Sequence, residues 1–209
     1  MDLFKDRVDA GKQLVKKLLK YKKNTIVLAI PRGGVIVGNE VAQSLGAKLD
    51  IVVPRKIGSP EDPEFAIGAV APDGSTSLNE DVASSYNISE TYIRNKVKEE
   101  IQEIKRRMTT YRGNKPFPKL KNKIVILVDD GVATGNTIIA SVKFIKKQKP
   151  KKIAIAVPVA PSDFVNKVFS MVDEVITLKP LEPYYAISMH YLNFEQTTDE
   201  EVIAILKKY

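Results

Sequence analysis

The sequence contains no cysteine and no tryptophan, and its one histidine is His190. Disulfides and thiolate metal sites are therefore excluded, and a single histidine cannot build a histidine-based zinc cluster. Any bound metal would be a hard cation on oxygen ligands. No continuous apolar run reaches the roughly 18 residues that suggest a membrane span, and the polar N-terminal stretch MDLFKDRVDAGKQ does not resemble a signal peptide. We expect a soluble, cytoplasmic protein without a membrane partner.

The charge balance favours anionic partners. Lys and Arg number 33 against 25 Asp and Glu, a net charge of +8, which suits phosphates, nucleic acid or acidic lipid. The lysines lie mostly in pairs scattered over the predicted helices, as on an ordinary solvated surface, so a nucleic-acid partner is not our expectation. A chain of 209 residues with 44% hydrophobic content suits a single domain spanning residues 1–209.

Apolar runs alternate with helical patterns along the chain. TIVLAI (25–30), the helical stretch 35–46 and LDIVVP (49–54) form one βαβ unit, so its two strands should be parallel. The same alternation resumes later, with strands KIVILVDD, KIAIAVPVA and EVITLKP and helices at about 135–148 and 162–170. Further helices are predicted at 2–21, at 89–111 with a Ser89 cap, and in TTDEEVIAILKKY, where Thr198 stands three residues before Glu201 as in a capping box. Aliphatic runs without polar alternation indicate a parallel sheet covered on both faces. The predicted fold is α/β, Rossmann-like, with a core over about 22–180.

Two segments break this alternation. Residues 56–82 are rich in Gly, Pro, Ser and Asp and contain a probable hairpin around Pro72-Asp73-Gly74. Residues 181–196 are aromatic and irregular. A long irregular insertion in a compact domain is usually functional.

The stretch ILVDDGVATGNTI (126–138) carries the chemistry. Asp129 and Asp130 follow a buried strand, where two carboxylates can accept hydrogen bonds from a vicinal diol. Residues 131–137 offer backbone N–H groups and hydroxyls at a helix start, which favours an anion. A diol and a phosphate together describe a ribose 5-phosphate. The segment lacks the Gly-Lys-Ser/Thr of a P-loop and the G-x-G-x-x-G of dinucleotide enzymes.

VILVDDGVATGNT resembles the 5-phosphoribosyl pyrophosphate (PRPP) signature of the type I phosphoribosyltransferases. The order of elements over about residues 20–195 agrees with that family. The resemblance implies that Asp129 and Asp130 bind the ribose hydroxyls and, indirectly, a PRPP-bound Mg²⁺. It assigns the 5-phosphate to Ala133, Thr134, Gly135, Asn136 and Thr137. Gly131 departs from the aliphatic residue usual in the family, and we interpret it as a change in loop flexibility.

Three further stretches fit the resemblance. PRGG (31–34) resembles the pyrophosphate loop, with Arg32, Gly33 and Gly34 contacting the anion. Arg55 and Lys56, placed at the end of the second strand, resemble the basic pair that contacts pyrophosphate. The segment 56–80 matches the flexible loop that closes over the substrate. Residues 180–196 match the hood that receives the base: Tyr184, Tyr185, Tyr191 and Phe194 could stack on it, and Tyr184, Tyr185 and His190 are the candidate base-binding residues.

The implied reaction displaces pyrophosphate from C1 of PRPP by a ring nitrogen, with Mg²⁺ as cofactor and Asp129, Asp130, Arg55 and Lys56 as catalytic residues. Ala133 stands where hypoxanthine/guanine members carry an acid, so a proton acceptor would come from Glu61, Asp62 or Glu64. Nucleotide salvage is the expected role. Two alternatives stay open: a PRPP-binding regulator that contacts nucleic acid, and a transferase with a non-nucleobase acceptor. The resemblance also suggests a homodimer.

Overall fold

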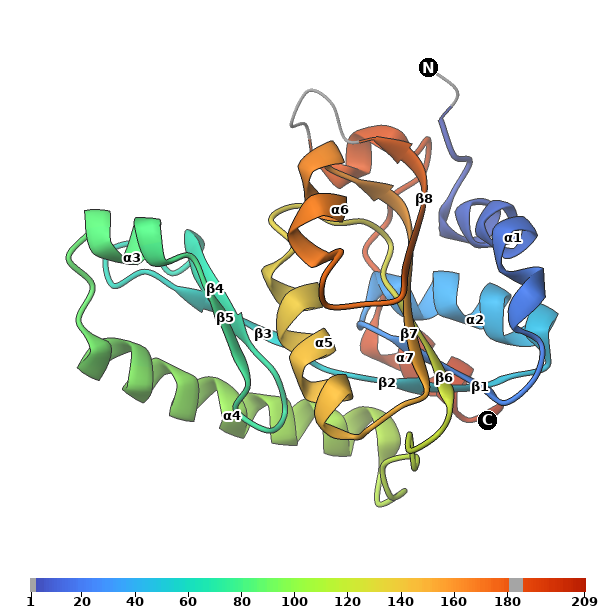
Figure 1. Ribbon diagram of the computed structural model, residues 1–209, viewed down its shortest axis with the longest axis horizontal. Coiled ribbons are helices and arrows are strands. Elements are labelled where there is room, and N and C mark those ends of the chain that lie inside the picture. Colours follow the sequence, from blue (N-terminus) through green and yellow to red (C-terminus); the bar gives the residue numbers. More distant parts are fainter. Residues whose placement is uncertain (1–2, 181–185) are drawn as a thin grey trace.

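The computed structural model describes residues 3–180 and 186–209 (Figure 1). Its strands are β1 (Thr25–Ala29), β2 (Lys48–Ile51), β3 (Arg55–Gly58), β4 (Ala66–Val70), β5 (Thr76–Leu78), β6 (Ile124–Val128), β7 (Lys152–Ala160) and β8 (Glu174–Pro180). Its helices are α1 (Arg7–Leu18), α2 (Gly33–Leu45), α3 (Glu80–Ser85), α4 (Glu90–Arg112), α5 (Asn136–Lys147), α6 (Ser162–Val168) and α7 (Asp199–Leu206), with 3-10 turns η1 (Leu19–Tyr21) and η2 (Ile187–His190).

The central sheet confirms the predicted α/β class. Its strands lie in the order β2-β1-β6-β7-β8, and every neighbouring pair is parallel. After β1 the chain first adds β2 on one side, and later adds β6 on the other. The strand order therefore reverses between β1 and β6, and the loops leaving these two strands diverge there. Such a reversal is where open α/β sheets bind ligands.

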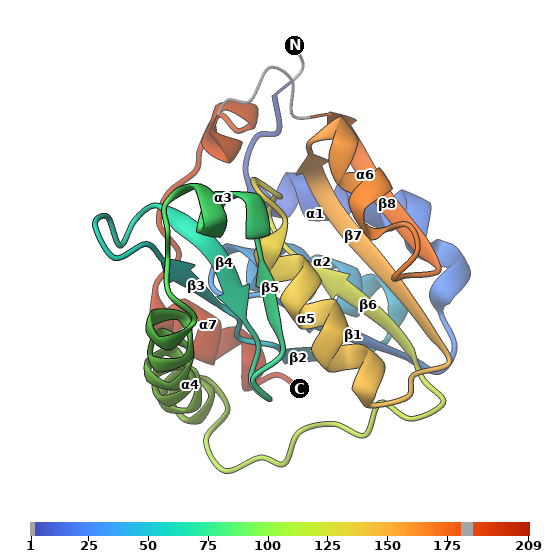
Figure 2. The same cartoon turned by 60° about the vertical axis from the view of Figure 1, so that its left-hand side comes forward.

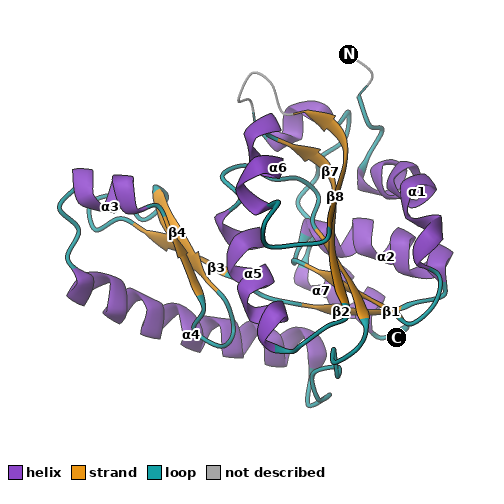
Figure 3. Ribbon diagram, in the orientation of Figure 1, coloured by secondary structure: helices purple, strands orange, loops and turns teal. Residues whose placement is uncertain are grey.

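Helices cover both faces of this sheet (Figures 2 and 3). Along β1, Val27 and Ala29 belong to the core that includes α1, α2 and α7, whereas Ile26 and Leu28 belong to the core under α5 and α6. Successive strand residues point to opposite faces, so a central strand such as β1 carries apolar side chains toward both cores. This accounts for the unbroken aliphatic runs in the sequence.

Side-chain caps set several helix ends. The predicted helix at 2–21 begins only at Arg7, because the Asp6 carboxylate accepts a hydrogen bond from the Asp9 N–H at 2.8 Å and caps the helix there. The Ser89 cap of α4 is confirmed. Thr198 and Glu201 form the predicted capping box of α7.

The inserted segment is more regular than predicted. The hairpin around Pro72-Asp73-Gly74 is confirmed as β4 and β5, but β3 also pairs antiparallel with β4, and α3 follows. The segment 56–80, predicted as a flexible β-hairpin loop, thus contains a third strand beside the hairpin. Its apolar residues, including Ile57 and Ile67, are fully buried in the same core as Ile104 of α4, so burial against that long helix orders it.

Arg55 and Lys56 also need a correction. The second strand ends at Ile51, and these two residues begin β3 in the smaller sheet. Pro54, which has no N–H to donate, lies between β2, which pairs with β1, and β3, which pairs with β4.

The hood contacts the N-terminal segment. Phe4 and Tyr191 form an isolated parallel bridge, and the centres of their rings lie 5.3 Å apart. Among the helices in the described part of the chain, none combines the length and apolar character needed to cross a membrane.

Candidate functional site

A cleft of about 870 Å³ opens at the carboxyl ends of β1 and β6 and extends along the smaller sheet and α4. Most of the predicted site residues line it together: Arg32, Gly33, Arg55, Lys56, Asp129, Asp130, Ala133, Thr134, Asn136 and Thr137. They come from separate segments of the chain. The strand-order reversal brings together the loops after β1 and β6, and the smaller sheet adds Arg55 and Lys56. Of the three proposed proton acceptors, Glu64 lines the cleft, and Glu61 and Asp62 do not.

Other predicted residues lie elsewhere. Gly34 and Gly135 support the loops without lining the cleft. His190 is buried in the hood, only 4% exposed and away from the cleft; burial lowers its pKa, and the charge of Lys179 lowers it further. Tyr184 and Tyr185 lie outside the described residues.

Asp129, the first residue after β6, lies directly before Asp130 in the chain. Its Oδ1 accepts a hydrogen bond from the Asp130 N–H at 2.8 Å. Burial, followed by the neighbouring Asp130 charge, raises the pKa of Asp129 well above its ordinary value. A buried acid beside a second carboxylate holds its proton more firmly than an exposed acid does.

Asp130 is paired with a residue that the sequence motif does not contain. Arg7 of α1 donates from Nε to Asp130 Oδ2 at 2.7 Å, and both side chains are largely buried. The Arg7 guanidinium lies 3.7 Å from the centre of the Phe194 ring. Tyr191 donates its hydroxyl to the Asp130 carbonyl at 2.6 Å. The hood and the N-terminal helix therefore hold the acidic turn, and Tyr191 and Phe194 serve packing.

Two glycines let the loop predicted to bind pyrophosphate (31–34) approach these acids. A Cβ on Gly33 would lie 1.9 Å from Asp130 Oδ2 and 2.6 Å from Arg7 Nε. A Cβ on Gly34 would lie 2.9 Å from both Cα and Oδ1 of Asp129. Any larger residue would push the β1–α2 loop away from the carboxylates.

The turn into α5 has the form of a phosphate cradle. Gly135 caps the helix with φ +82°, and a Cβ there would meet the Phe164 ring at 2.7 Å. Residues 133–137 thus present the first N–H groups of α5 to the cleft, where the helix dipole favours an anion. Ser77 of β5 donates to the Asn136 side chain at 3.0 Å and ties this loop to the smaller sheet.

Gly131 has a packing reason rather than a reason of flexibility. Ile187 of the hood lies where a side chain would stand, since a Cβ at 131 would be 2.4 Å from Ile187 Cγ2. Both residues line the cleft. Gly131 therefore makes room for an aliphatic residue that arrives from the hood.

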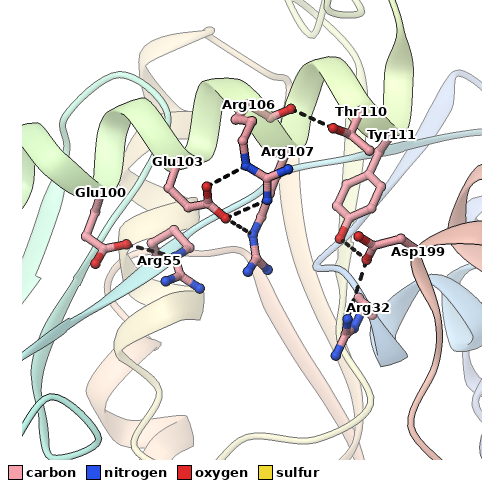
Figure 4. A network of polar contacts seen from close by, with 9 residues as sticks. All are labelled: Arg32, Arg55, Glu100, Glu103, Arg106, Arg107, Thr110, Tyr111 and Asp199. Carbon is pink, nitrogen blue, oxygen red and sulfur yellow. Dashed lines mark hydrogen bonds and ion pairs between the residues drawn. The ribbon is translucent and has the colours of Figure 1, made fainter.

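Arginine side chains that line the cleft are paired with carboxylates (Figure 4). Arg55 donates from Nε to Glu100 at 2.8 Å, and Arg32 lies 3.5 Å from Asp199 of α7. Asp199 also accepts from the Tyr111 hydroxyl at 2.7 Å, and this hydrogen bond, with the Arg32 charge, lowers the pKa of Asp199. Burial and the same carboxylate raise the pKa of Tyr111 to about 12. Each arginine is thus held by a carboxylate behind it.

Helix α4 contributes residues that sequence reasoning missed. Lys96, Glu99, Glu100 and Arg107 line the cleft. With Glu103, they follow helical spacing beside the apolar stripe, so they share one face. In the sequence, the sign that these residues belong to a site was a charged stripe beside an apolar one. Such a stripe is common on ordinary surface helices, so it does not single out a site. No signal in the sequence linked Arg7 to Asp130.

The donor set fits a cation that arrives with its ligand. Among the described residues no group of three or more acidic or histidine side chains could hold a metal ion. One oxygen of Asp130 already accepts from Arg7, and one oxygen of Asp129 accepts from the Asp130 N–H. Mg²⁺ commonly combines one or two protein carboxylates with substrate phosphates. In this cleft, Asp129 and Asp130 would supply the protein carboxylates.

Comparisons with known proteins agree with this geometry. Two Mycobacterium tuberculosis proteins, of strains CDC 1551 and H37Rv, each called a "putative phosphoribosyl transferase", are 39% identical over all 209 residues. The chain spans 47% of their length, so it corresponds to about half of these curated relatives. The crystal structure of TT1426 from Thermus thermophilus matches with a TM-score of 0.81 at 36% identity, over 99% of this chain and 98% of that one.

A more distant structure, the AQ2163 protein of Aquifex aeolicus, matches at 15% identity with a TM-score of 0.51, over 83% of this chain and 74% of that one. That likeness concerns the fold alone. The family model described as the phosphoribosyl transferase domain covers residues 4–179, which include both acids, the phosphate cradle and the pyrophosphate loop. The chain belongs to the phosphoribosyl transferase domain family, with the fold of the type I phosphoribosyltransferases.

Proposed function

We propose that this chain transfers 5-phosphoribose from PRPP to a nucleobase, with Mg²⁺-dependent release of pyrophosphate, as in nucleotide salvage. One observation carries the proposal. The two acids, the phosphate cradle of α5, the pyrophosphate loop and the Arg55-Lys56 pair line a single cleft of about 870 Å³. A diol, a phosphate and a diphosphate occur together in PRPP, and each finds a matching group in this cleft.

The residues divide the work of binding. Residues 133–137 hold the 5-phosphate at the start of α5, while the carboxylate of Asp130 accepts from the ribose hydroxyls through its free oxygen. Arg7 keeps that carboxylate oriented. Gly33 lets the backbone reach the diphosphate, and Arg32, Arg55 and Lys56 add positive charge.

The transfer breaks the bond between C1 and the diphosphate oxygen, and the electron pair leaves with the diphosphate. A ring nitrogen of the acceptor donates its lone pair to C1 and afterwards loses its proton, for which Glu64 is the candidate in the cleft. Fixed cations near the leaving group stabilise its growing charge. Mg²⁺, when bound to the diphosphate, would neutralise part of that charge.

A second candidate acceptor class has one observation in its favour. Among the described residues lining the cleft, Phe65 is the only aromatic, whereas Tyr191 and Phe194 pack against Phe4 and Arg7. A base would therefore find little aromatic surface from the described hood. This favours a non-nucleobase acceptor as the alternative.

Pyrophosphate release tests the proposal. The purified protein is incubated with Mg²⁺ and PRPP, alone and with adenine, guanine, hypoxanthine, xanthine, uracil or orotate. We expect one base to stimulate release, and Asp130→Asn to abolish it because a neutral amide neither pairs with Arg7 nor accepts as strongly from a diol. PRPP binding without stimulation by any base would redirect the function to another acceptor or to PRPP sensing. Absence of PRPP binding would refute the proposal.

A further inference from the structure

Three arginines from three separate elements line the cleft. Arg32 precedes α2, Arg55 begins β3, and Arg107 lies in the second half of α4. Their side chains are 34%, 33% and 31% exposed, respectively. Figure 4 shows all three guanidinium groups on the same side of α4. Arg107 belongs to none of the stretches that carry the family resemblance.

Arg107 contacts Glu103 only through its Nε, so its two outer nitrogens are available to a ligand. Its Nε donates to Glu103 Oε1 at 2.7 Å, and its two terminal nitrogens make no hydrogen bond or ion pair within the described part of the chain. Arg55 is held in the same manner, through Nε to Glu100. A guanidinium fixed at Nε presents its two outer nitrogens as a planar fork, which matches two oxygens of a phosphate.

The neighbouring Arg106 is used differently. It donates to Glu103 from Nε at 2.7 Å and from Nη2 at 2.9 Å, so one of its two outer nitrogens is already engaged. Its side chain is 61% exposed, and it does not line the cleft. One carboxylate thus serves two arginines. Two positive charges therefore face one negative charge, and of the two arginines only Arg107 lines the cleft.

The position of Arg107 points to the diphosphate end of the cleft. The positive charge of Arg107 lowers the pKa of Asp199 and of Tyr111. The charge of Arg32, in the pyrophosphate loop, lowers the pKa of the same two groups. Arg107 and Arg32 therefore share one neighbourhood. Two guanidinium groups that face one cleft repel each other until an anion binds between them.

We propose that Arg107 is a third diphosphate-binding arginine, which completes an arc formed with Arg32 and Arg55. This inference rests on the proposed function and names a residue of that site. The arc would hold the leaving group from three directions and would make α4 part of the active site.

Arg107→Gln and Arg106→Gln form a matched pair of variants, because each removes one arginine from Glu103 but only the first changes the cleft. Binding of inorganic pyrophosphate with Mg²⁺, and of PRPP, is measured by calorimetry on both variants and the unchanged chain. We expect Arg107→Gln to weaken both ligands roughly 10- to 100-fold, the range for a lost hydrogen bond to a charged group, and Arg106→Gln to change them less than about twofold. Arg107→Lys should recover part of the affinity, because it restores the charge without the fork.

Thermal unfolding of the variants separates binding from folding. Because both glutamine variants lose one Glu103 partner, we expect similar, small decreases in Tm. Equal ligand affinities for Arg107→Gln and Arg106→Gln, in a chain that binds PRPP, would overturn the assignment of Arg107 while leaving the proposed function intact. If the unchanged chain binds neither pyrophosphate nor PRPP, the proposed function itself fails.

Discussion

At the scale of single residues, the site depends on the absence of side chains as much as on their presence. Gly33 and Gly34 leave room for the two carboxylates, and Gly131 leaves room for Ile187. Gly135 needs both a left-handed backbone and the space beside Phe164. The glycines thus set how closely the two loops and the hood approach one another.

Gly131→Ala tests this complementarity. The added Cβ would lie 2.4 Å from Ile187 Cγ2, so we expect a loss of roughly 1–3 kcal/mol of unfolding free energy, as in other overpacked sites. Ile187→Ala removes the atoms that clash. Urea unfolding of both single variants and the double variant should show that Gly131→Ala costs less in the presence of Ile187→Ala. Simple additivity of the two effects would contradict the packing explanation.

At the scale of elements, α4 joins the smaller sheet to the cleft. Its apolar side packs on β3 and β4, with Ile104 fully buried, and its charged stripe faces the cleft. Glu103 lies at the centre of that stripe. Its hydrogen bonds from Arg106 and then Arg107 lower its pKa from 4.5 to about 2.

The lowered pKa of Glu103 predicts a pH-dependent contribution to stability. A carboxyl group whose pKa is lower in the folded state stabilises the fold above its unfolded pKa, and this contribution is lost as pH falls through the folded pKa. We expect Glu103→Gln to be less stable than the unchanged chain at pH 7 by at most about 1 kcal/mol, because the ion pairs are partly exposed. The difference should shrink between pH 4.5 and about 2. Chemical unfolding at pH 7 and at a pH near the lower limit measures it, and a difference independent of pH would exclude the ion pairs as its cause.

At the scale of the whole molecule, burial is uneven. After their first residue, β6 and β7 are buried along their length, whereas α3 has no buried residue. Amide hydrogen exchange should therefore be slowest in β6 and β7, which exchange only when the whole domain unfolds, and fast in α3, which opens locally. Addition of PRPP with Mg²⁺ should slow exchange at residues 31–34 and 129–137. Slow exchange throughout α3 would contradict this picture. The predicted homodimer is a separate question for analytical ultracentrifugation.

Local patterns predicted most of the framework. The unbroken aliphatic runs identified the strands of the parallel sheet, because each position there faces an apolar layer. Ser89 and Thr198 marked helix starts through hydrogen bonds to nearby backbone N–H groups. The β3 strand escaped prediction, because RKIG carries no alternation and becomes a strand only by pairing with β4.

The sequence by itself determined the two acids at a strand end and the turns at 31–34 and 131–137, since each is a contiguous motif whose geometry follows from a strand, a turn and a helix start. Only the tertiary structure decided which residues surround them. Arg7 meets Asp130 across 123 positions, and Ile187 fills the space at Gly131. Arg107 reaches the cleft because burial of the smaller sheet orients α4. Such contacts depend on how whole elements pack, and the spacing of residues along one segment carries no record of that packing.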